Sequence, residues 1–339
     1  MSEPASRDKW AEWVLARGHA DDAEQKRRKL EFLGPIRDRV LGNARVRPGE
    51  VVLDVGAGDG LIAFGAMPLV EESGCVVFCD VSQDLLDHCR NAAKELGVAE
   101  RAEFVRAAAE DLSPIPDGSV DVVTTRSVLI FVQRKDAAFR EFHRVLRPGG
   151  RVSIFEPINN YFPQDTDYFS GFDAHSVRDL VEKIWVSEGW VAANHPKDPM
   201  MNFNERDLLR HAEAAGFAEV HGELVIDVEP GTWVEDWDRL LGTSPNPNAR
   251  TTAEAIAAAL TREEAERFEA HLRPLVDAGR GLMRSAFAYL WAVKSTGDTG
   301  RGSWGSRRGP ATLPRGRGVE SRRLAEGPVS GPSFHARVD

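Results

Sequence analysis

The sequence predicts an α/β fold built on a doubly wound, mostly parallel sheet. Short aliphatic and β-branched runs recur between residues 51 and 155, and a stretch with helical character follows the first, second and fourth of them. The first run, Val51 to Leu53, passes directly into the glycine-rich turn Asp54 to Gly60. A turn of this composition between a buried strand and a helix is typical of the first unit of such sheets.

The glycines predict a site for a small cofactor, because residues without a Cβ let a ligand contact bare backbone. Gly56, Gly58 and Gly60 follow the spacing G-x-G-x-G. The dinucleotide fingerprint G-x-G-x-x-G would require glycine where this chain has Leu61, which disfavours a nicotinamide-dependent oxidoreductase. Asp54 also suits a ligand with an ammonium group better than a pyrophosphate. A tight turn without a ligand is the alternative for this motif alone.

At these residues the chain resembles the class I S-adenosylmethionine-dependent methyltransferases, in particular the methyltransferase type 11 and ubiquinone/menaquinone-methyltransferase-like group. The stretch FHRVLRPGGRVSIFEP, at residues 142 to 157, matches the family segment that leads into the fifth strand. The similar region covers about residues 48 to 157, under half of the chain. The resemblance implies a Rossmann-like, seven-stranded sheet that ends in an antiparallel hairpin. It also implies that S-adenosyl-L-methionine is the cofactor and that a small organic molecule accepts the methyl group.

The resemblance assigns cofactor contacts to several turns of this chain. In the family, the acidic residue and glycines of the first turn hold the methionine end of the cofactor. Asp80 ends the second predicted strand, which begins at Cys75, and lies about 20 residues past the last glycine, where a carboxylate can accept hydrogen bonds from a ribose diol. Its alternative role is a helix cap, which Ser82 can fill alone. The predicted cofactor-binding residues are Asp54, Gly56, Ala57, Gly58, Gly60, Asp80, Val81, Ala109, Glu110, Arg126 and Ser127.

The loop after a third strand, Glu103 to Ala107, is expected to face the adenine ring. Family members often place Asp or Asn one residue before an Ala–acid pair, a position that Ala108 occupies here. The sequence departs from the family at this point. The backbone of Ala109 or the side chain of Glu110 or Asp111 would then contact the adenine amino group.

Two further strands are expected to bring polar residues to the reactive end of the cofactor. The fourth, Val120 to Thr125, ends at Arg126 and Ser127. A helix over Lys135 to Leu146 and a turn over Arg147 to Gly150 precede the fifth strand, Arg151 to Phe155.

Methyl transfer is an in-line displacement in which positioning can carry much of the catalysis, so a dedicated base is not always needed. An acceptor hydroxyl or acidic carbon would require one. Glu156, at the tip of the fifth strand, is the best-placed candidate, and ordering of the following loop is an equally good role for it. His175 and His195 are weaker candidates.

Residues 1 to 46 are expected to form a helical cap, with two helices between residues 6 and 45. The first helix carries Trp10 and Trp13, and Gly34-Pro35 predicts a kink in the second. Aromatic residues are frequent between 158 and 200, and they predict either a wall of the substrate pocket or a small satellite core. Our hypothesis is that the cap and the stretch Tyr161 to Trp190 close over the cofactor.

The rest of the methyltransferase domain, residues 47 to 296, has a helix at Asn204 to Ala215, a strand at Glu219 to Val228 and a last strand at Ser285 to Lys294. Residues 229 to 282 would be a helical insertion in the final hairpin, and Thr261 to Glu264 is a capping box. Gly, Pro and Arg dominate residues 297 to 339, which predicts a disordered tail.

The formal net charge of −10 argues against nucleic acid as the main partner, although the tail has eight arginines and four acidic residues. No stretch resembles a signal peptide or a membrane span, so a cytoplasmic protein is expected. The three cysteines predict reduced, mostly buried side chains and no metal site. A non-catalytic cofactor-binding protein and a nucleic-acid binder that uses the tail are alternatives, and the sequence identifies neither the acceptor nor the oligomeric state.

Overall fold

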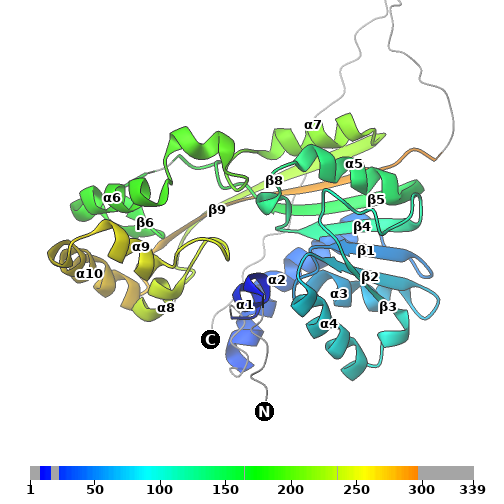
Figure 1. Ribbon diagram of the computed structural model, residues 1–339, viewed down its shortest axis with the longest axis horizontal. Coiled ribbons are helices and arrows are strands. Elements are labelled where there is room, and N and C mark those ends of the chain that lie inside the picture. The colour runs from blue at the N-terminus through cyan, green and yellow to red at the C-terminus, as the bar shows by residue number, and fades with distance from the viewer. Residues whose placement is uncertain (1–7, 17–22, 164, 235, 297–339) are drawn as a thin grey trace, which may run out of the picture. The chain divides into compact units, whose positions relative to one another are not determined.

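The computed structural model describes residues 8–16, 23–163, 165–234 and 236–296. A seven-stranded sheet in the order β3-β2-β1-β4-β5-β9-β8 forms its centre (Figure 1). β1 to β5 run parallel, whereas β9 pairs antiparallel with β5 and with β8. This arrangement confirms the predicted Rossmann-like sheet and its antiparallel final hairpin. The strands are β1 Val51–Val55, β2 Cys75–Asp80, β3 Ala102–Arg106, β4 Val120–Arg126, β5 Leu146–Pro157, β8 Glu219–Pro230 and β9 Leu282–Val293.

The core has two layers, one on each side of the sheet, because successive residues of a strand face opposite sides of the sheet. Val52 and Val122 pack on the side covered by α2 and α3. Leu53 and Val123 pack on the side covered by α5 and α7. All four side chains are fully buried. The helices that cover the sheet are α2 Ala23–Ala44, α3 Leu61–Val70, α4 Gln83–Glu95, α5 Lys135–Val145 and α7 Glu205–Ala215.

Side chains cap two of these helices, at Ser82 as predicted and at Asn204, which was expected as the first helical residue. Ser82 is the N-cap of α4 and its side chain accepts a hydrogen bond from the Leu85 backbone N–H. Asn204 caps α7 in a reciprocal capping box with Asp207. The two predicted N-terminal helices are present as α1, Lys9–Ala16, and α2, which contains Pro35.

The segment from Arg147 to Gly150 differs from its prediction as a turn before the fifth strand. It belongs to β5, with Leu146 paired to Val120 and Arg151 paired to Val122, so the extra residues form an irregularity in the ladder. The physical reason is a distant partner: Gly149 N–H donates to the Lys294 carbonyl at 2.9 Å, just past the end of β9.

The two long insertions pack together into one helical cluster. It contains α6 Arg178–Glu188, α8 Trp237–Gly242, α9 Thr252–Ala259, α10 Arg262–Asp277 and the hairpin of β6 Tyr168–Phe169 and β7 Phe172–Asp173 (Figure 1). Phe172, Leu180 and Phe268 are fully buried in its core. The capping box at Thr261 and Glu264 is confirmed at the start of α10.

The C-terminal part of α2 is fixed to the sheet by a buried ion pair. Arg151 Nη2 lies 2.6 Å from Glu50 Oε2, and the same guanidinium donates to the Ala44 carbonyl at 2.8 Å. Nearer the middle of α2, Arg39 pairs with Glu223 of β8. These contacts hold α2 across the sheet, from the β4–β5 region to the β8 edge.

The cysteines are free thiols, as predicted. Cys79 and Cys89 are buried free thiols, and Cys75 is a half-buried one. Within the described ranges, no helix has both the length and the apolar character needed to span a bilayer. The predicted disordered tail, residues 297 to 339, lies outside the described residues.

Candidate active site

The glycine turn joins the carboxyl end of β1 to α3, and each glycine has a distinct surrounding. A Cβ at Gly56 would lie 2.3 Å from Val128 Cγ2, so packing excludes any larger residue there. Gly60 is the N-cap of α3. A Cβ at Gly58 would meet no atom nearer than 3.9 Å, although its φ of +57° disfavours other residues. The half-buried backbone of Gly58 therefore has room for a ligand beside it, between the turn and Val14 of α1.

Hydrogen bonds attach this turn to the end of β2. The N–H groups of Gly56 and Ala57 both donate to the Cys79 carbonyl, at 2.8 and 2.9 Å. Gly58 N–H donates to Asp80 Oδ2 at 2.9 Å. The predicted ribose-binding acid and the glycine turn are thus adjacent.

Asp80 is 7% exposed, and each of its oxygens accepts one backbone hydrogen bond. The second donor is the N–H of Ser82, at 2.9 Å from Oδ1. Burial raises the pKa of Asp80, while these N–H donors oppose the rise. Since a carboxylate has about four acceptor positions, Asp80 keeps capacity for two hydroxyl groups. Ser82 caps α4, so the cap role does not require Asp80.

Asp54 lies beneath the turn rather than on its open side. Its Oδ1 accepts from the Thr124 hydroxyl at 2.8 Å and its Oδ2 from the Ala63 N–H at 3.1 Å. Burial raises the pKa of Asp54 to about 7, and the nearby charge of Arg126 opposes this rise. Both oxygens thus hold β4 and the start of α3 in place around the turn.

The tip of β4 is conformationally unusual. Ser127 has a φ of +55°, a left-handed conformation that non-glycine residues rarely adopt, and its N–H donates to the Phe155 carbonyl at 2.8 Å. Strain of this kind is concentrated at functional sites. Arg126, one residue earlier, is half-buried.

Glu156 is fully buried at the end of β5, and both of its oxygens are occupied. Oε1 accepts the N–H groups of Val128 and Leu129 at 2.9 Å each, and Oε2 accepts the N–H of Ile130 at 3.1 Å. Burial raises the pKa of Glu156 to about 7, although the three N–H donors favour the ionised form and oppose this rise. Of the two expected roles, this geometry favours ordering a loop over acting as a base. The ordered loop, however, is the one after β4, which includes the short helix η2, Leu129–Phe131.

The loop after β3 lies beside Asp80, as expected for an adenine-facing segment. Ala107 N–H donates to the Asp80 carbonyl at 3.1 Å. The loop closes on itself through an Asp111 N–H to Ala108 carbonyl bond of 3.0 Å. Ala109 is buried and Glu110 half-buried, whereas the side chain of Val81 is 42% exposed and offers an apolar surface next to Asp80.

The sequence predicted a helix with Trp10 and Trp13 as a cap over the site, but not the residues that this helix, α1, contacts. The rings of Trp10 and Trp13 pack edge-on against Phe131, with centroid distances of 5.1 and 5.8 Å. Trp13 Nε1 also donates to Ser244 Oγ at 3.1 Å, in the loop between α8 and α9. Asp8, directly before α1, accepts the Ser82 hydroxyl at 2.7 Å. An aspartate directly before an amphipathic helix indicates an N-cap at Asp8, but no local pattern indicates that Asp8 also contacts Ser82.

Lys135 is a second residue that sequence reasoning missed. It is 4% exposed, and burial lowers its pKa to about 8. Its Nζ donates to the carbonyls of Val132 and Pro199 at 2.9 Å and to Asn202 Oδ1 at 2.8 Å. Lys135 thereby ties the end of the first insertion to the loop after β4.

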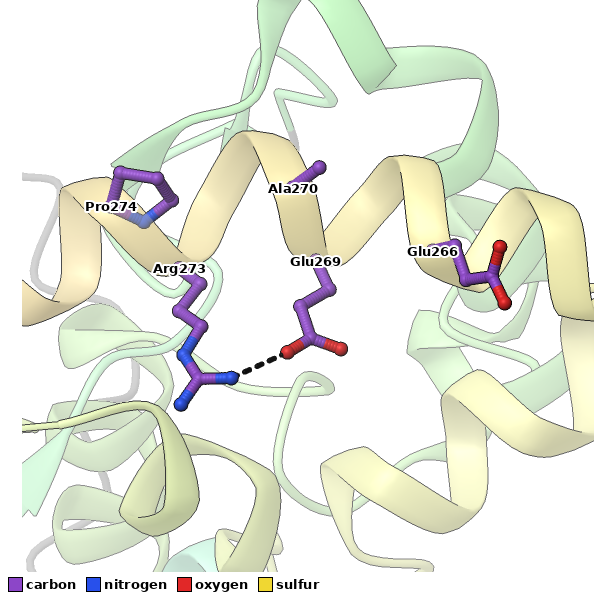
Figure 2. A pocket seen from close by; sticks show the side chains of 5 residues that line it. All are labelled: Glu266, Glu269, Ala270, Arg273 and Pro274. Carbon is purple, nitrogen blue, oxygen red and sulfur yellow. Dashed lines mark hydrogen bonds and ion pairs between the residues drawn. The ribbon is translucent and has the colours of Figure 1, made fainter.

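Other candidate positions lie away from the strand ends. Figure 2 shows a surface hollow whose lining side chains all come from α10, with Glu269 and Arg273 paired at 2.7 Å. One exposed helix face brings no residues from other elements together, so we assign it no role. His175 lies at the helical cluster, with Nδ1 3.1 Å from Asp167 Oδ1.

Comparison with known proteins identifies the family of the chain. A family profile described as "Methyltransferase domain" matches residues 53–154. The ubiquinone/menaquinone biosynthesis C-methyltransferase UbiE of Pseudomonas putida is 40% identical over 195 residues, covering 52% of this chain and 73% of that protein. The UbiE protein of Cronobacter sakazakii is 33% identical over 183 residues, covering 52% and 69%. The solved structure of the YcgJ protein of Bacillus subtilis covers 77% of this chain and 98% of its own, with 18% identity and a TM-score of 0.48.

The matched profile runs from β1 to β5 and so contains the glycine turn, Asp80 and the tip of β4. The similarity to the Pseudomonas protein extends over more than two thirds of that protein at 40% identity. The chain therefore belongs to the class I S-adenosylmethionine-dependent methyltransferases.

Proposed function

We propose that the enzyme holds S-adenosylmethionine across the carboxyl ends of β1, β2 and β4 and methylates a small organic acceptor. The observation that carries this placement is the half-buried, uncrowded backbone of Gly58 beside the buried carboxylate of Asp80. The proposed cofactor-binding residues are those predicted from the sequence: Asp54, Gly56, Ala57, Gly58, Gly60, Asp80, Val81, Ala109, Glu110, Arg126 and Ser127.

Each part of this set has a distinct task. Asp80 accepts the ribose hydroxyls, and Val81 with the loop at Ala109 and Glu110 faces the adenine. Asp54 holds the turn from below the methionine end, while Arg126 and Ser127 line the reactive end. When bound, the cofactor supplies an electrophilic methyl group on a sulfonium.

The acceptor side is walled by α1 and the loop after β4. Trp10, Trp13 and Phe131 offer large apolar surfaces, and Ser244 brings the helical cluster to the same place. Small-molecule sites are usually apolar with a few convergent polar groups. The named relatives are C-methyltransferases of ubiquinone and menaquinone biosynthesis, so a quinol-type ring carbon is the first acceptor class to test.

Catalysis by positioning fits this site better than catalysis by a carboxylate base. Glu156 is fully buried and its oxygens accept three backbone N–H groups, so the carboxyl group serves the loop and has no surface open to an acceptor. Its role is to fix the backbone of residues 128 to 130, which places Phe131. The acceptor must then be oriented by the surrounding wall and react as an already nucleophilic species.

The test measures methyl transfer to a small panel of acceptors: a naphthoquinol, a catechol and a primary amine. The release of S-adenosylhomocysteine reports turnover. We expect methyl transfer to one class, with Asp80→Asn slowing it at subsaturating cofactor. Binding of S-adenosylmethionine without turnover on the panel or on a metabolite extract would favour a non-catalytic regulator. Absence of binding would reject the site.

The domain limits are part of the same proposal: a cap at residues 1 to 46, a methyltransferase domain at 47 to 296 and a tail at 297 to 339. The buried free thiols of Cys79 and Cys89 support a reducing compartment, hence a cytoplasmic location.

A further inference from the structure

Two helix N-termini meet beside the candidate cofactor site. Asp8 caps α1, since its Oδ1 accepts the Ala11 N–H at 2.9 Å. Its Oδ2 accepts the hydroxyl of Ser82, the N-cap of α4, at 2.7 Å. In the opposite direction, the Asp8 N–H donates to Asp84 Oδ2, in the first turn of α4, at 2.6 Å. We name Asp8, Ser82 and Asp84 the α1–α4 latch.

The latch continues into the cofactor site through Ser82. The hydroxyl of Ser82 donates to Asp8 and accepts from the Leu85 N–H at 3.1 Å, so both of its hydrogen-bonding directions are fixed. The backbone N–H of the same residue donates to Asp80 Oδ1. The other oxygen of Asp80 accepts from Gly58. A continuous chain of hydrogen bonds therefore joins Asp8 to the glycine turn.

Helix α1 depends on such contacts for its position. It has eight residues, which is too short for a helix to be stable in water by itself. Its C-terminal half lies over the turn, because Val14 Cγ1 is 3.9 Å from the position of a Cβ at Gly58. Asp8 lies outside the residues that match the family profile, which begin at residue 53.

We propose that Asp8 is a positioning residue of the cofactor site, acting through Ser82 to hold the carboxylate of Asp80 in the orientation that receives the ribose diol. The helix α1 thereby becomes part of the cofactor site as well as a wall of the acceptor site. This inference rests on the proposed function, in which Asp80 binds the ribose.

The test measures binding of S-adenosylhomocysteine and of its 2′,3′-dideoxy analogue to the full-length protein by calorimetry. Asp8→Ala should weaken S-adenosylhomocysteine binding about three- to tenfold, less than the loss of a charge-assisted hydrogen bond to the ligand itself, because Asp8 acts only through Ser82. Binding of the dideoxy analogue should change less than about twofold, because that ligand has no diol for Asp80 to receive. Ser82→Ala should act in the same direction, and the double variant should be no weaker than the weaker single one.

Asp87→Asn is the matched control. Asp87 is an exposed carboxylate on α4 that pairs with Arg90 and accepts a hydrogen bond from Gln83. Its substitution should leave the affinity for both ligands unchanged. Asp8→Asn keeps a good helix cap and separates the loss of charge from unfolding of α1.

Equal weakening of both ligands in Asp8→Ala would mean general loosening of α1 and would overturn the positioning role, as would unchanged affinity for both. Asp80→Asn separates failure of the proposed cofactor site from failure of the positioning role of Asp8. If it leaves S-adenosylhomocysteine binding intact, the proposed cofactor site fails and this inference falls with it. If it weakens binding while Asp8→Ala does not, only the inference fails.

Discussion

The backbone N–H of Ile130 donates to Glu156 Oε2 at 3.1 Å, so the end of β5 holds the loop that follows β4. Two neighbouring N–H groups, of Val128 and Leu129, are bound by the other oxygen of the same carboxylate. The loop carries Phe131, which contacts both tryptophans of α1. A single buried carboxyl group therefore determines where the apolar wall of the acceptor site lies.

Glu156→Gln should slow methyl transfer at least about tenfold while S-adenosylmethionine affinity stays within about threefold. The amide has one acceptor oxygen, so its NH2 group would face a backbone N–H and displace the loop. The measurement is kcat and acceptor KM as a function of pH. A base at this position would instead make the variant lose the limb of the pH–rate profile near the Glu156 pKa of about 7.

The same substitution should change the pH dependence of stability. Burial raises the pKa of Glu156 from 4.5 to about 7, so the native state keeps a proton that the unfolded chain releases in this window. The contribution of this bound proton to the free energy of unfolding is full below pH 4.5 and is lost as the pH rises through 7. The free energy of unfolding of the wild type relative to Glu156→Gln should therefore fall, by up to about 3 kcal/mol, between about pH 5 and about pH 8. Urea denaturation at the two pH values measures this difference, and a constant or widening gap would contradict it.

Removal of residues 1 to 20 should abolish methyl transfer and weaken cofactor binding only moderately, because α1 forms the acceptor wall whereas the sheet holds the turn and Asp80. Trp13→Phe is the milder variant. It loses the N–H bond to Ser244 but keeps an aromatic ring, and acceptor KM should rise about threefold. Trp233→Phe, at an exposed tryptophan that packs on Phe32, is the control. Full turnover by the truncated enzyme would remove α1 from the acceptor site.

Deletion of residues 297 to 339 should leave the melting temperature and cofactor affinity unchanged, since the composition of this tail provides no apolar face to bury. A deletion from residue 282 is the contrasting control. It removes β9, which pairs with both β5 and β8, and should prevent folding. A melting temperature many degrees lower after the shorter deletion would show that the tail packs on the domain.

Most of the sheet follows from local sequence. The run Cys75 to Asp80 coincides with β2, and the caps at Ser82, Asn204 and Thr261 all lie where short-range patterns indicate them. Such elements are predictable because their determinants, burial alternation and side-chain capping, lie within a few residues of each other.

The parts that were not predicted depend on partners far along the chain. Asp8 meets Ser82, and Trp13 meets Ser244, through packing that no local pattern encodes. The aromatic stretch divides for the same reason: Phe169 and Phe172 enter the core of the helical cluster because α10 supplies Phe268 opposite them. Glu156 could be placed at a strand tip from the sequence, but the loop that it binds could not.

The most direct test of the cofactor site is calorimetric binding of S-adenosylhomocysteine to Gly58→Val and Asp80→Ala. A valine at Gly58 would be strained at a φ of +57° and would fill the accessible side of the turn. Loss of Asp80 would remove up to two charge-assisted hydrogen bonds, each worth about 1.5 to 3 kcal/mol. We predict at least about tenfold weaker binding in each variant, with melting temperatures that confirm folding. Wild-type affinity in both folded variants would contradict the placement of the cofactor at these strand ends.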